Sequence, residues 1–373
     1  LLAVAEELKK LEPQPQLSYI GHRGDNLHGL VGAHAGVGAA YKIFAGKFRR
    51  YHGAGWTQFF DLLTTLKNIR DGFMILIGLF QSIILIRKLK PDVVFIKGGF
   101  VGVPVGLAAR FWRVAYVTHD SDALPGLANR LLARGASAHA VAMPKASYNY
   151  PAEKTIEVGV PVMPGYQYVT SELMSKARLE LNIPDSASVL FVTGGGNGSR
   201  RVNNAVVSAS PNLFASVNNL YILHQVGKKL EAECQKSYLK VLDAKTRNRV
   251  RVYGFTDKMQ RLSTSANLVI SRSGATAMAE FAMQGKAVVV VPNPILTGGH
   301  QLKNAAVFEA KKACVVVRED ALDSLGNVII GLLHDRDKRR ALGEELHKFA
   351  KPDAAELTAQ LILSVAQNQF GAS

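Results

Sequence analysis

Short runs of β-branched and apolar residues alternate with helix-length segments along most of the chain, and this alternation limits the possible folds more than any other feature. Strands separated by helix-length segments form parallel sheets with helical crossovers. We therefore expect an α/β protein. The runs predicted as strands are 17–20, 93–96, 114–119, 138–143, 155–160, 189–193, 220–224, 250–255, 268–271, 288–291 and 314–317.

The predicted strands fall into two sets, one on each side of a proline-rich segment at residues 161–164. Prolines stop regular structure and stiffen a short hinge. A chain of 373 residues is also long for one core. We expect two Rossmann-like domains, residues 1–161 and 162–350, with a carboxyl-terminal helix at 351–373 packing back on the first domain.

One apolar run, residues 73–86, raises the question of a membrane span. A polar Gln81-Ser82 pair interrupts it. It is about 14 residues long, whereas a spanning helix needs roughly 20. A buried helix is the expected structure.

The chain has a net charge of +16, which requires an anionic partner or surface. Nucleic acid, anionic lipid and phosphorylated substrates are the three candidates. Both halves are basic, so the charge belongs to folded surfaces and not to a tail. The two cysteines, Cys234 and Cys314, lack metal-ligand spacing and indicate neither a disulfide framework nor a zinc site.

A glycine-rich turn, Gly194 to Ser199, follows the predicted strand 189–193 and precedes a helical stretch. Glycines let the backbone approach a phosphate, and the next helix offers unpaired N–H groups to it. Such turns also occur for close packing alone. A nicotinamide-dinucleotide site is disfavoured because Ser199 replaces the last glycine and the next strand ends in His224-Gln225, without an acidic residue.

A second turn of the same kind runs from Ser271 through Arg272, Ser273 and Gly274 into a helix. Backbone N–H groups of Gly274, Ala275 and Thr276 suit a diphosphate. Glu280, in the second turn of that helix, suits ribose hydroxyls. Alone, Glu280 would be an ordinary surface residue.

A third polar stretch follows the predicted strand 288–291, where open α/β sheets place their ligands. It includes His300, Gln301 and Asn304. The two amides can donate and accept at sugar hydroxyls, although either could equally be a cap or a surface residue.

Taken together, these motifs resemble the carboxyl-terminal half of the MurG-type N-acetylglucosaminyltransferases. The Arg-Ser-Gly-Ala helix start with Glu280 six residues after Gly274 carries the resemblance, as does His-Gln-x-x-Asn-Ala from His300. Further matches are His224-Gln-x-Gly-Lys, Phe255-Thr-Asp-Lys-Met, Lys90-Pro-Asp-Val-Val before Gly98-Gly-Phe-Val, and His119-Asp before Gly126-Leu-x-Asn. The resemblance spans roughly residues 1–350 and is strongest from 188 to 306.

The resemblance implies a GT-B fold, with two Rossmann-like domains whose parallel sheets face a central cleft. It implies transfer of GlcNAc from UDP-GlcNAc to an undecaprenyl-pyrophosphate-linked muramyl peptide, giving lipid II. Glu280 would bind the ribose, Phe255 and Thr256 would flank the uracil, and His300 with Gln301 would hold the GlcNAc. Residues expected at the diphosphate are Gly196, Asn197, Gly198, Ser199, Ala275 and Thr276. Gly195, Arg272, Ser273, Gly274, Asn304 and Asp122 complete the predicted substrate-binding set.

The sequence departs from the family pattern at several points. Asp122 stands where the family has Asn, and Met163 stands where it has a hinge arginine. The family's first strand and its Gly-rich loop ending in His would lie upstream of Leu1. Because Leu1 already opens an amphipathic helix without a cap residue, we expect a fragment. The missing first strand would normally be central in such a sheet, so we expect reduced stability.

Inverting sugar transfer requires a base for the acceptor hydroxyl and positive potential for the departing diphosphate. Helix N-termini can supply the potential. Because helix N-termini can do this without a metal, neither a cofactor nor an obligatory divalent ion is predicted. His119, at the end of a first-domain strand, is the best catalytic candidate within this sequence. A satisfied core histidine is the alternative.

A lipid-linked acceptor implies contact with an anionic membrane surface, and basic residues mix with aromatic ones between 42 and 60. The predicted membrane residues are Lys42, Lys47, Phe48, Arg49, Arg50 and Trp56. The same composition would suit RNA, but no nucleic-acid-binding motif is present, so no nucleic-acid partner is predicted. The expected location is the cytoplasmic face of the bacterial cell membrane, as a peripheral protein.

Three alternatives remain open at this point. The chain could be another GT-B enzyme, either a glycolipid synthase or a UDP-GlcNAc epimerase, or an inactive nucleotide-sugar-binding subunit. An epimerase would need paired carboxylates in the first domain, for which Asp120 and Asp122 are the candidates.

Overall fold

The computed structural model describes residues 1–11, 14–23, 31, 37–46, 62–295 and 299–370. The chain divides into two compact units. The first unit holds Leu1–Pro164, Ile295–His300 and Lys351–Ser373, and the second holds Gly165–Pro294 and Gln301–Ala350.

The second unit is a six-stranded parallel sheet in the order β12-β11-β10-β7-β8-β9. Its strands are β7 (Ser188–Thr193), β8 (Leu220–Gln225), β9 (Val250–Tyr253), β10 (Leu268–Ser271), β11 (Val288–Val290) and β12 (Val315–Val316). From β7, the later strands are added on both sides: β8 and β9 on one side, and β10, β11 and β12 on the other. In a doubly wound sheet, that arrangement opens a ligand-binding crevice beyond the carboxyl ends of the central strands.

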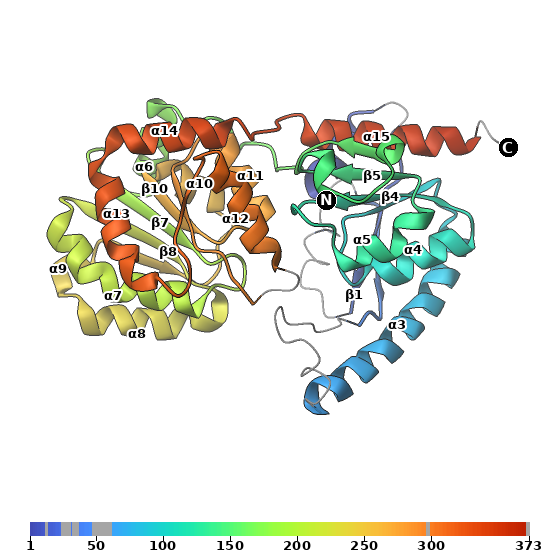
Figure 1. Ribbon diagram of the computed structural model, residues 1–373, viewed down its shortest axis with the longest axis horizontal. Helices are drawn as coiled ribbons and strands as arrows, with labels where there is room; N and C mark the ends of the chain where they lie inside the picture. The colour runs from blue at the N-terminus through green and yellow to red at the C-terminus, as the bar shows by residue number, and fades with distance from the viewer. Residues whose placement is uncertain (12–13, 24–30, 32–36, 47–61, 296–298, 371–373) are drawn as a thin grey trace. The chain divides into compact units, whose positions relative to one another are not determined.

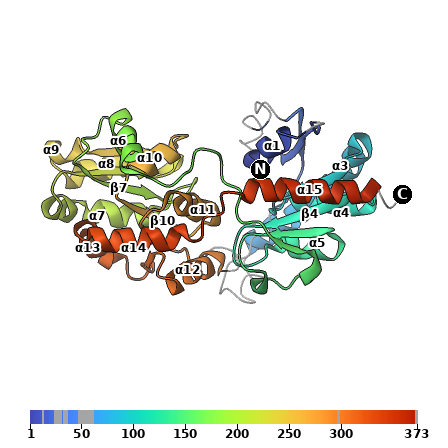
Figure 2. The ribbon, with the colours of Figure 1, turned by 90° about the horizontal axis from the view of Figure 1, so that it is seen from above.

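The central strands are continuous apolar runs because both faces of the sheet are covered, and successive side chains point to opposite faces. Leu190, Val192, Ile222 and Ile270 belong to one fully buried core, together with Leu213 of α7. The helices α7 (Arg200–Ser216) and α13 (Leu325–His334) lie side by side over this face (Figure 2). The other helices of the unit are α6 (Ser171–Glu180), α8 (Glu231–Val241), α9 (Ala244–Arg247), α10 (Met259–Ser265), α11 (Ala275–Gln284), α12 (His300–Ala310) and α14 (Arg336–His347).

The first unit contains a four-stranded parallel sheet in the order β3-β4-β5-β6 and a separate parallel pair, β1-β2. The strands are β1 (Ser18–His22), β2 (Ala39–Ile43), β3 (Val93–Ile96), β4 (Ala115–Asp120), β5 (Ala138–Val141) and β6 (Thr155–Glu157). Strand β2 was not among the expected strands.

Helices cover both faces of the four-stranded sheet (Figure 1). On one face lies α15 (Ala354–Phe370), which also packs against α1 (Leu2–Lys9). The helix α4 (Gly102–Phe111) contacts β3 and β4, α5 (Leu127–Leu132) contacts β4, and α3 (Leu62–Leu89) packs along α4.

Helix α3 corrects one expectation from the sequence. Residues 73–86 are helical, as expected, but the helix is buried on one side only. Phe73 is 62% exposed and Phe80 is 67% exposed. Among the described residues, Ile69–Leu89 is the one helical stretch long and apolar enough to cross a membrane, judged by length and composition, with 22% of its apolar window buried. The apolar run at 73–86 is the central part of a helix that extends from Leu62 to Leu89.

Candidate functional site: loops at the carboxyl edge of the second sheet

The loop from Gly194 to Ser199 connects β7 to α7, and its backbone is packed tightly against the end of β8. Gly198 has a φ of +73°, and a Cβ there would lie 1.8 Å from the carbonyl oxygen of Val226. Gly195 also has a positive φ, of +81°, and its N–H donates to the Thr193 hydroxyl at 3.2 Å. Only glycine adopts such angles without strain, so the sequence fixes a turn that presents its backbone at the start of α7.

The outer part of this loop is open. Gly195, Gly196 and Asn197 are exposed, and no described heavy atom lies within 4 Å of a Cβ built on Gly195 or Gly196. Ser199 is buried and caps α7, because its hydroxyl accepts from the Val202 N–H at 3.4 Å. The loop can therefore offer backbone N–H groups to an anion from its exposed side.

The second loop enters α11 after β10, the strand next to β7. Gly274 is the N-cap residue and provides no side-chain cap, so the first-turn N–H groups of α11 are without a side-chain acceptor from that position. Ala275 is buried and Thr276 is exposed. Because β7 and β10 are adjacent and parallel, the two helix starts lie at the same edge of one sheet. Two N-termini directed to one edge suit a diphosphate.

Glu280 lies in the second turn of α11 and is half-buried. Burial raises the pKa of the Tyr166 phenol, and the charge of Glu280 and its hydrogen bond to that phenol raise it further. Tyr166 thus lies beside the carboxylate that the resemblance assigns to ribose.

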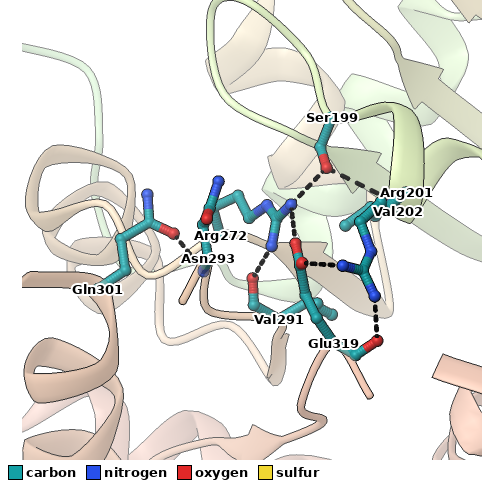
Figure 3. Close-up of polar contacts among 8 residues, drawn as sticks. All are labelled: Ser199, Arg201, Val202, Arg272, Val291, Asn293, Gln301 and Glu319. Carbon is teal, nitrogen blue, oxygen red and sulfur yellow. Dashed lines mark hydrogen bonds and ion pairs between the residues drawn. The ribbon is translucent and has the colours of Figure 1, made fainter. Parts of the chain in front are cut away.

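Several predicted site residues tie the third loop to the second. The Ser273 hydroxyl donates to the carbonyl of Gln301 at 2.6 Å, and the fully buried Asn304 donates to the carbonyl of Ser273 at 2.9 Å. The Gln301 amide oxygen accepts from the Asn293 N–H at 2.9 Å (Figure 3). His300 is the first residue of α12. In this structure Asn304 and Ser273 hold α12 against the loop after β10.

Arg272 is buried, and its guanidinium faces protein groups. It donates to the carbonyl of Val291 at 2.9 Å and to the Ser199 hydroxyl at 2.6 Å, and it pairs with Glu319 at 2.5 Å (Figure 3). Burial lowers its pKa, which the Glu319 carboxylate partly offsets. Sequence reasoning missed Glu319, because a lone acid after a short strand carries no motif.

Phe255 and Thr256 follow β9. Phe255 is 56% exposed, and the Lys228 ammonium lies 5.3 Å from its ring centroid. The Thr256 hydroxyl accepts from the Lys258 N–H at 3.0 Å. An exposed ring at the carboxyl edge of the sheet is available for stacking with a base.

His119 lies at the end of β4 in the first unit and is 1% exposed. Its Nε2 is 3.0 Å from the carbonyl oxygen of Gly159, and its Nδ1 is 3.3 Å from the Ser121 hydroxyl. Burial lowers its pKa to about 3, so the ring is neutral at physiological pH. This geometry favours a core histidine whose ring nitrogens are satisfied by protein groups. A catalytic role for His119 stays an untested prediction.

The two first-unit aspartates differ in environment. Asp120 is buried and accepts from the Gly126 N–H at 2.9 Å and the Tyr150 hydroxyl at 2.8 Å, and burial raises its pKa. Asp122 is half-buried. Because the oxygens of Asp120 already accept protein donors, this pair does not form the two free carboxylates that an epimerase would need. Within the described part of the chain, no group of three His, Cys, Asp or Glu side chains is placed to hold a metal ion.

The fold and these loops define a class: a two-unit α/β protein in which two helix starts at the carboxyl edge of the second sheet are suited to an anion. The chain belongs to glycosyltransferase family 28. The family's amino-terminal domain model matches residues 1–141, and its carboxyl-terminal domain model matches residues 189–358.

Named relatives agree with this assignment. The chain is 31% identical to the UDP-N-acetylglucosamine--N-acetylmuramyl-(pentapeptide) pyrophosphoryl-undecaprenol N-acetylglucosamine transferase of Salinibacter ruber, covering 98% of this chain and 92% of the relative. It is 28% identical to the protein of the same name from Flavobacterium psychrophilum, with 99% and 94% covered.

Solved structures agree on the fold. The MurG structure from Acinetobacter baumannii superposes with a TM-score of 0.70 at 24% identity, covering 97% of this chain and 94% of that one. A UDP-GlcNAc 2-epimerase from Neisseria meningitidis, bound to UDP-GlcNAc, gives a TM-score of 0.63 at 14% identity, with 97% and 95% covered. At these identities the likeness establishes the GT-B fold and nothing about the reaction.

Proposed function

We propose that this chain transfers GlcNAc from UDP-GlcNAc to undecaprenyl-pyrophosphoryl-MurNAc-peptide, with lipid II as the product. The observation that carries the proposal is the match of both family 28 domains, together with full-length relatives named for this reaction. The two helix starts at the edge of the second sheet supply the diphosphate-binding chemistry that the reaction requires.

In this reaction the acceptor hydroxyl oxygen attacks the anomeric carbon and gives its proton to a base, while the bond from that carbon to the UDP oxygen breaks and UDP leaves. Negative charge grows on the diphosphate as that bond breaks. Backbone N–H groups at the starts of α7 and α11 would stabilise that charge, because they are fixed before the reaction begins. Glu280 would accept hydrogen bonds from the ribose hydroxyls.

Product analysis with UDP-GlcNAc and a lipid I analogue tests the reaction, and calorimetry with UDP tests the site. A disaccharide-linked lipid and free UDP are expected. UDP binding without turnover would favour an inactive binding subunit, and free UDP with an altered hexosamine would favour an epimerase.

The role of Glu280 has its own test. Glu280→Gln is expected to weaken UDP binding at least about tenfold, as loss of a hydrogen bond to a charged group does. The parent protein should bind 2′-deoxy-UDP more weakly than UDP, whereas the variant should bind the two alike. Glu344→Gln, on the exposed part of α14, is the matched control. Equal discrimination by parent and Glu280→Gln would contradict the ribose assignment.

We further propose that the protein binds the cytoplasmic face of the bacterial membrane through α3. The exposed apolar side chains of this helix recur at helical spacing and form one stripe: Ile69, Phe73, Leu76, Ile77, Phe80 and Ile84. Phe111 and Trp112 are exposed at the end of α4, and the Trp112 indole donates to the carbonyl of Ile83 at 2.9 Å. A contiguous exposed apolar stripe marks an interaction surface.

Basic residues accompany the stripe. The Arg87 guanidinium lies 5.4 Å from the Trp112 ring centroid, and Lys88, Arg110 and Arg113 are exposed close by in the sequence. Aromatic and aliphatic groups with flanking cations suit an anionic lipid surface. Of the membrane residues expected from the sequence, Lys42 is exposed on β2, and Lys47, Phe48, Arg49, Arg50 and Trp56 lie outside the described residues.

The opposite side of α3 is packed against protein, which favours lying on a membrane over crossing it. Ser82 and Ile86 are buried, and the Phe44 N–H donates to the Gln81 side chain at 2.8 Å. A Cβ on Gly78 would lie 1.9 Å from the Phe44 carbonyl oxygen. The helix therefore offers one apolar side to lipid, whereas a lone spanning helix is apolar all round.

Vesicle sedimentation tests this attachment. Phe73→Ser/Phe80→Ser should abolish binding to anionic vesicles, and Leu179→Ser/Leu239→Ser, which alters exposed leucines of the second unit, should not. High salt should weaken binding by the parent. Resistance of membrane-bound protein to alkaline extraction would contradict a peripheral attachment, and unchanged sedimentation of the phenylalanine variant would contradict the role of α3.

A further inference from the structure

Glu319 lies at the centre of a polar network at the carboxyl edge of the second sheet (Figure 3). It follows β12, and its side chain is 5% exposed. One carboxylate oxygen is 2.5 Å from an Arg272 nitrogen, and the other is 3.0 Å from Arg201. The Glu319 carbonyl also accepts from Arg201 at 2.9 Å.

Through Arg272, this carboxylate connects segments that follow four different strands. Glu319 follows β12, Val291 follows β11, Arg272 follows β10, and Ser199 closes the loop after β7. These four strands are neighbours in the sheet. Arg272 therefore cross-links the glycine-rich loop to the loop that enters α11.

The cross-link depends on Glu319 for an electrostatic reason. The Arg272 side chain is 9% exposed, so its charge is largely removed from water. A buried cation without its counter-ion is costly, and it reorients or admits water to be compensated. Either response would release the Ser199 hydroxyl, which also caps α7.

We propose that Glu319 is a positioning residue for the nucleotide diphosphate. It holds Arg272 in place, and Arg272 sets the spacing between the glycine-rich loop and the start of α11. Glu319 touches no substrate in this scheme. Arg272 holds the two loops at a fixed separation and does not itself bind the diphosphate. The inference rests on the proposed nucleotide site and adds a residue that no motif indicated.

The expected consequence is specific to the donor. Misplaced loops weaken binding of UDP and UDP-GlcNAc, whereas the lipid acceptor does not depend on their spacing. We expect Glu319→Gln to raise the Kd for UDP and the donor KM about tenfold, equivalent to about 1.4 kcal/mol, with the acceptor KM unchanged. A purely structural role would lower the unfolding temperature and leave the Kd of the folded fraction as it was.

Two further variants complete the experiment, which uses the full chain, UDP calorimetry and thermal unfolding. Glu319→Asp keeps the charge with a shorter side chain, and it gives a second measurement if Glu319→Gln does not fold. It should weaken UDP binding less than the Gln variant does. Glu180→Gln removes the carboxylate of an exposed ion pair with Arg261 and serves as the matched control, with an unchanged Kd.

The outcomes separate the two proposals. A parent protein that does not bind UDP would overturn the nucleotide site and this inference together. A parent that binds UDP, with folded Glu319 variants that bind it equally well, would overturn this inference alone.

Discussion

Three glycines of the loop after β7, Gly195, Gly196 and Gly198, give a graded test of how its backbone is held. Gly198 has a positive φ, and a Cβ there would lie 1.8 Å from the Val226 carbonyl oxygen. Gly195 has a positive φ, but no described heavy atom lies within 4 Å of its added Cβ. Gly196 has neither constraint.

The expected costs follow from these differences. Gly196→Ala should leave the free energy of unfolding nearly unchanged. Gly195→Ala should cost about 1–2 kcal/mol, the strain of a side chain at positive φ. Gly198→Ala adds displacement of the loop from the end of β8 and should cost about 2–5 kcal/mol.

Urea unfolding of the three variants measures these costs, and UDP calorimetry reports on function separately. Gly196→Ala places a methyl group on the open side of the loop, so we expect weaker UDP binding without lost stability. Equal stability of Gly198→Ala and Gly196→Ala would refute the packing argument. Unchanged UDP binding by Gly196→Ala would count against a diphosphate on that side.

The other predictions concern buried groups. His119 and His224 are buried, and burial lowers the pKa of each to about 3, below an unfolded value of about 6.5. The unfolded chain then binds more protons below pH 6.5, so stability should fall as the pH drops from 6.5 toward 3, by about 2 kcal/mol per histidine at pH 5. Urea unfolding of the parent at pH 5 and 7.5 checks this, and a His224→Gln variant with the same pH dependence would contradict it. Burial raises the pKa of Cys234 and Cys314 to about 12, so neither thiol should react with a disulfide reagent at pH 8 until denaturant is added, and fast labelling of the native protein would contradict this.

The strands were predictable because buried parallel strands are short apolar runs with their own signature. Each run that was expected to be a strand overlaps one, and the ends agree within a few residues. Strand β2 (Ala39–Ile43) was missed, since Tyr41 and Lys42 interrupt its apolar pattern and glycines surround it. The glycine-rich turns could be located for the same local reason, because strand, glycine and helix stand in sequence.

The orientation of α3 could not be predicted from composition. Hydrophobic residues cover most of the helix, and the sequence does not say which side meets protein. Contacts distant in sequence decide it: Gly78 fits against Phe44, and Gln81 binds the Phe44 N–H. These contacts bury one side and leave Phe73 and Phe80 exposed.

The network around Arg272 was also beyond sequence reasoning, although Arg272 itself stood in a motif. A motif arginine next to a predicted diphosphate site suggests a ligand. The structure instead surrounds its guanidinium with Glu319, Val291 and Ser199, which lie far apart in the chain. Only the strand order β12-β11-β10-β7 brings these groups together.

The buried Arg272–Glu319 pair is poorly explained as a source of stability. Removing two charges from water costs several kcal/mol per ion, and apolar residues of similar size often replace such pairs without loss. A directional pair does what apolar residues cannot, because its hydrogen bonds fix angles and spacing as well as proximity. Here those bonds end on the Ser199 cap and on the Val291 carbonyl, one at each side of the loop that enters α11. The main effect of the pair is therefore to fix the positions of the loops at the carboxyl edge of the sheet. A diphosphate bound there would require the two helix starts at a fixed separation.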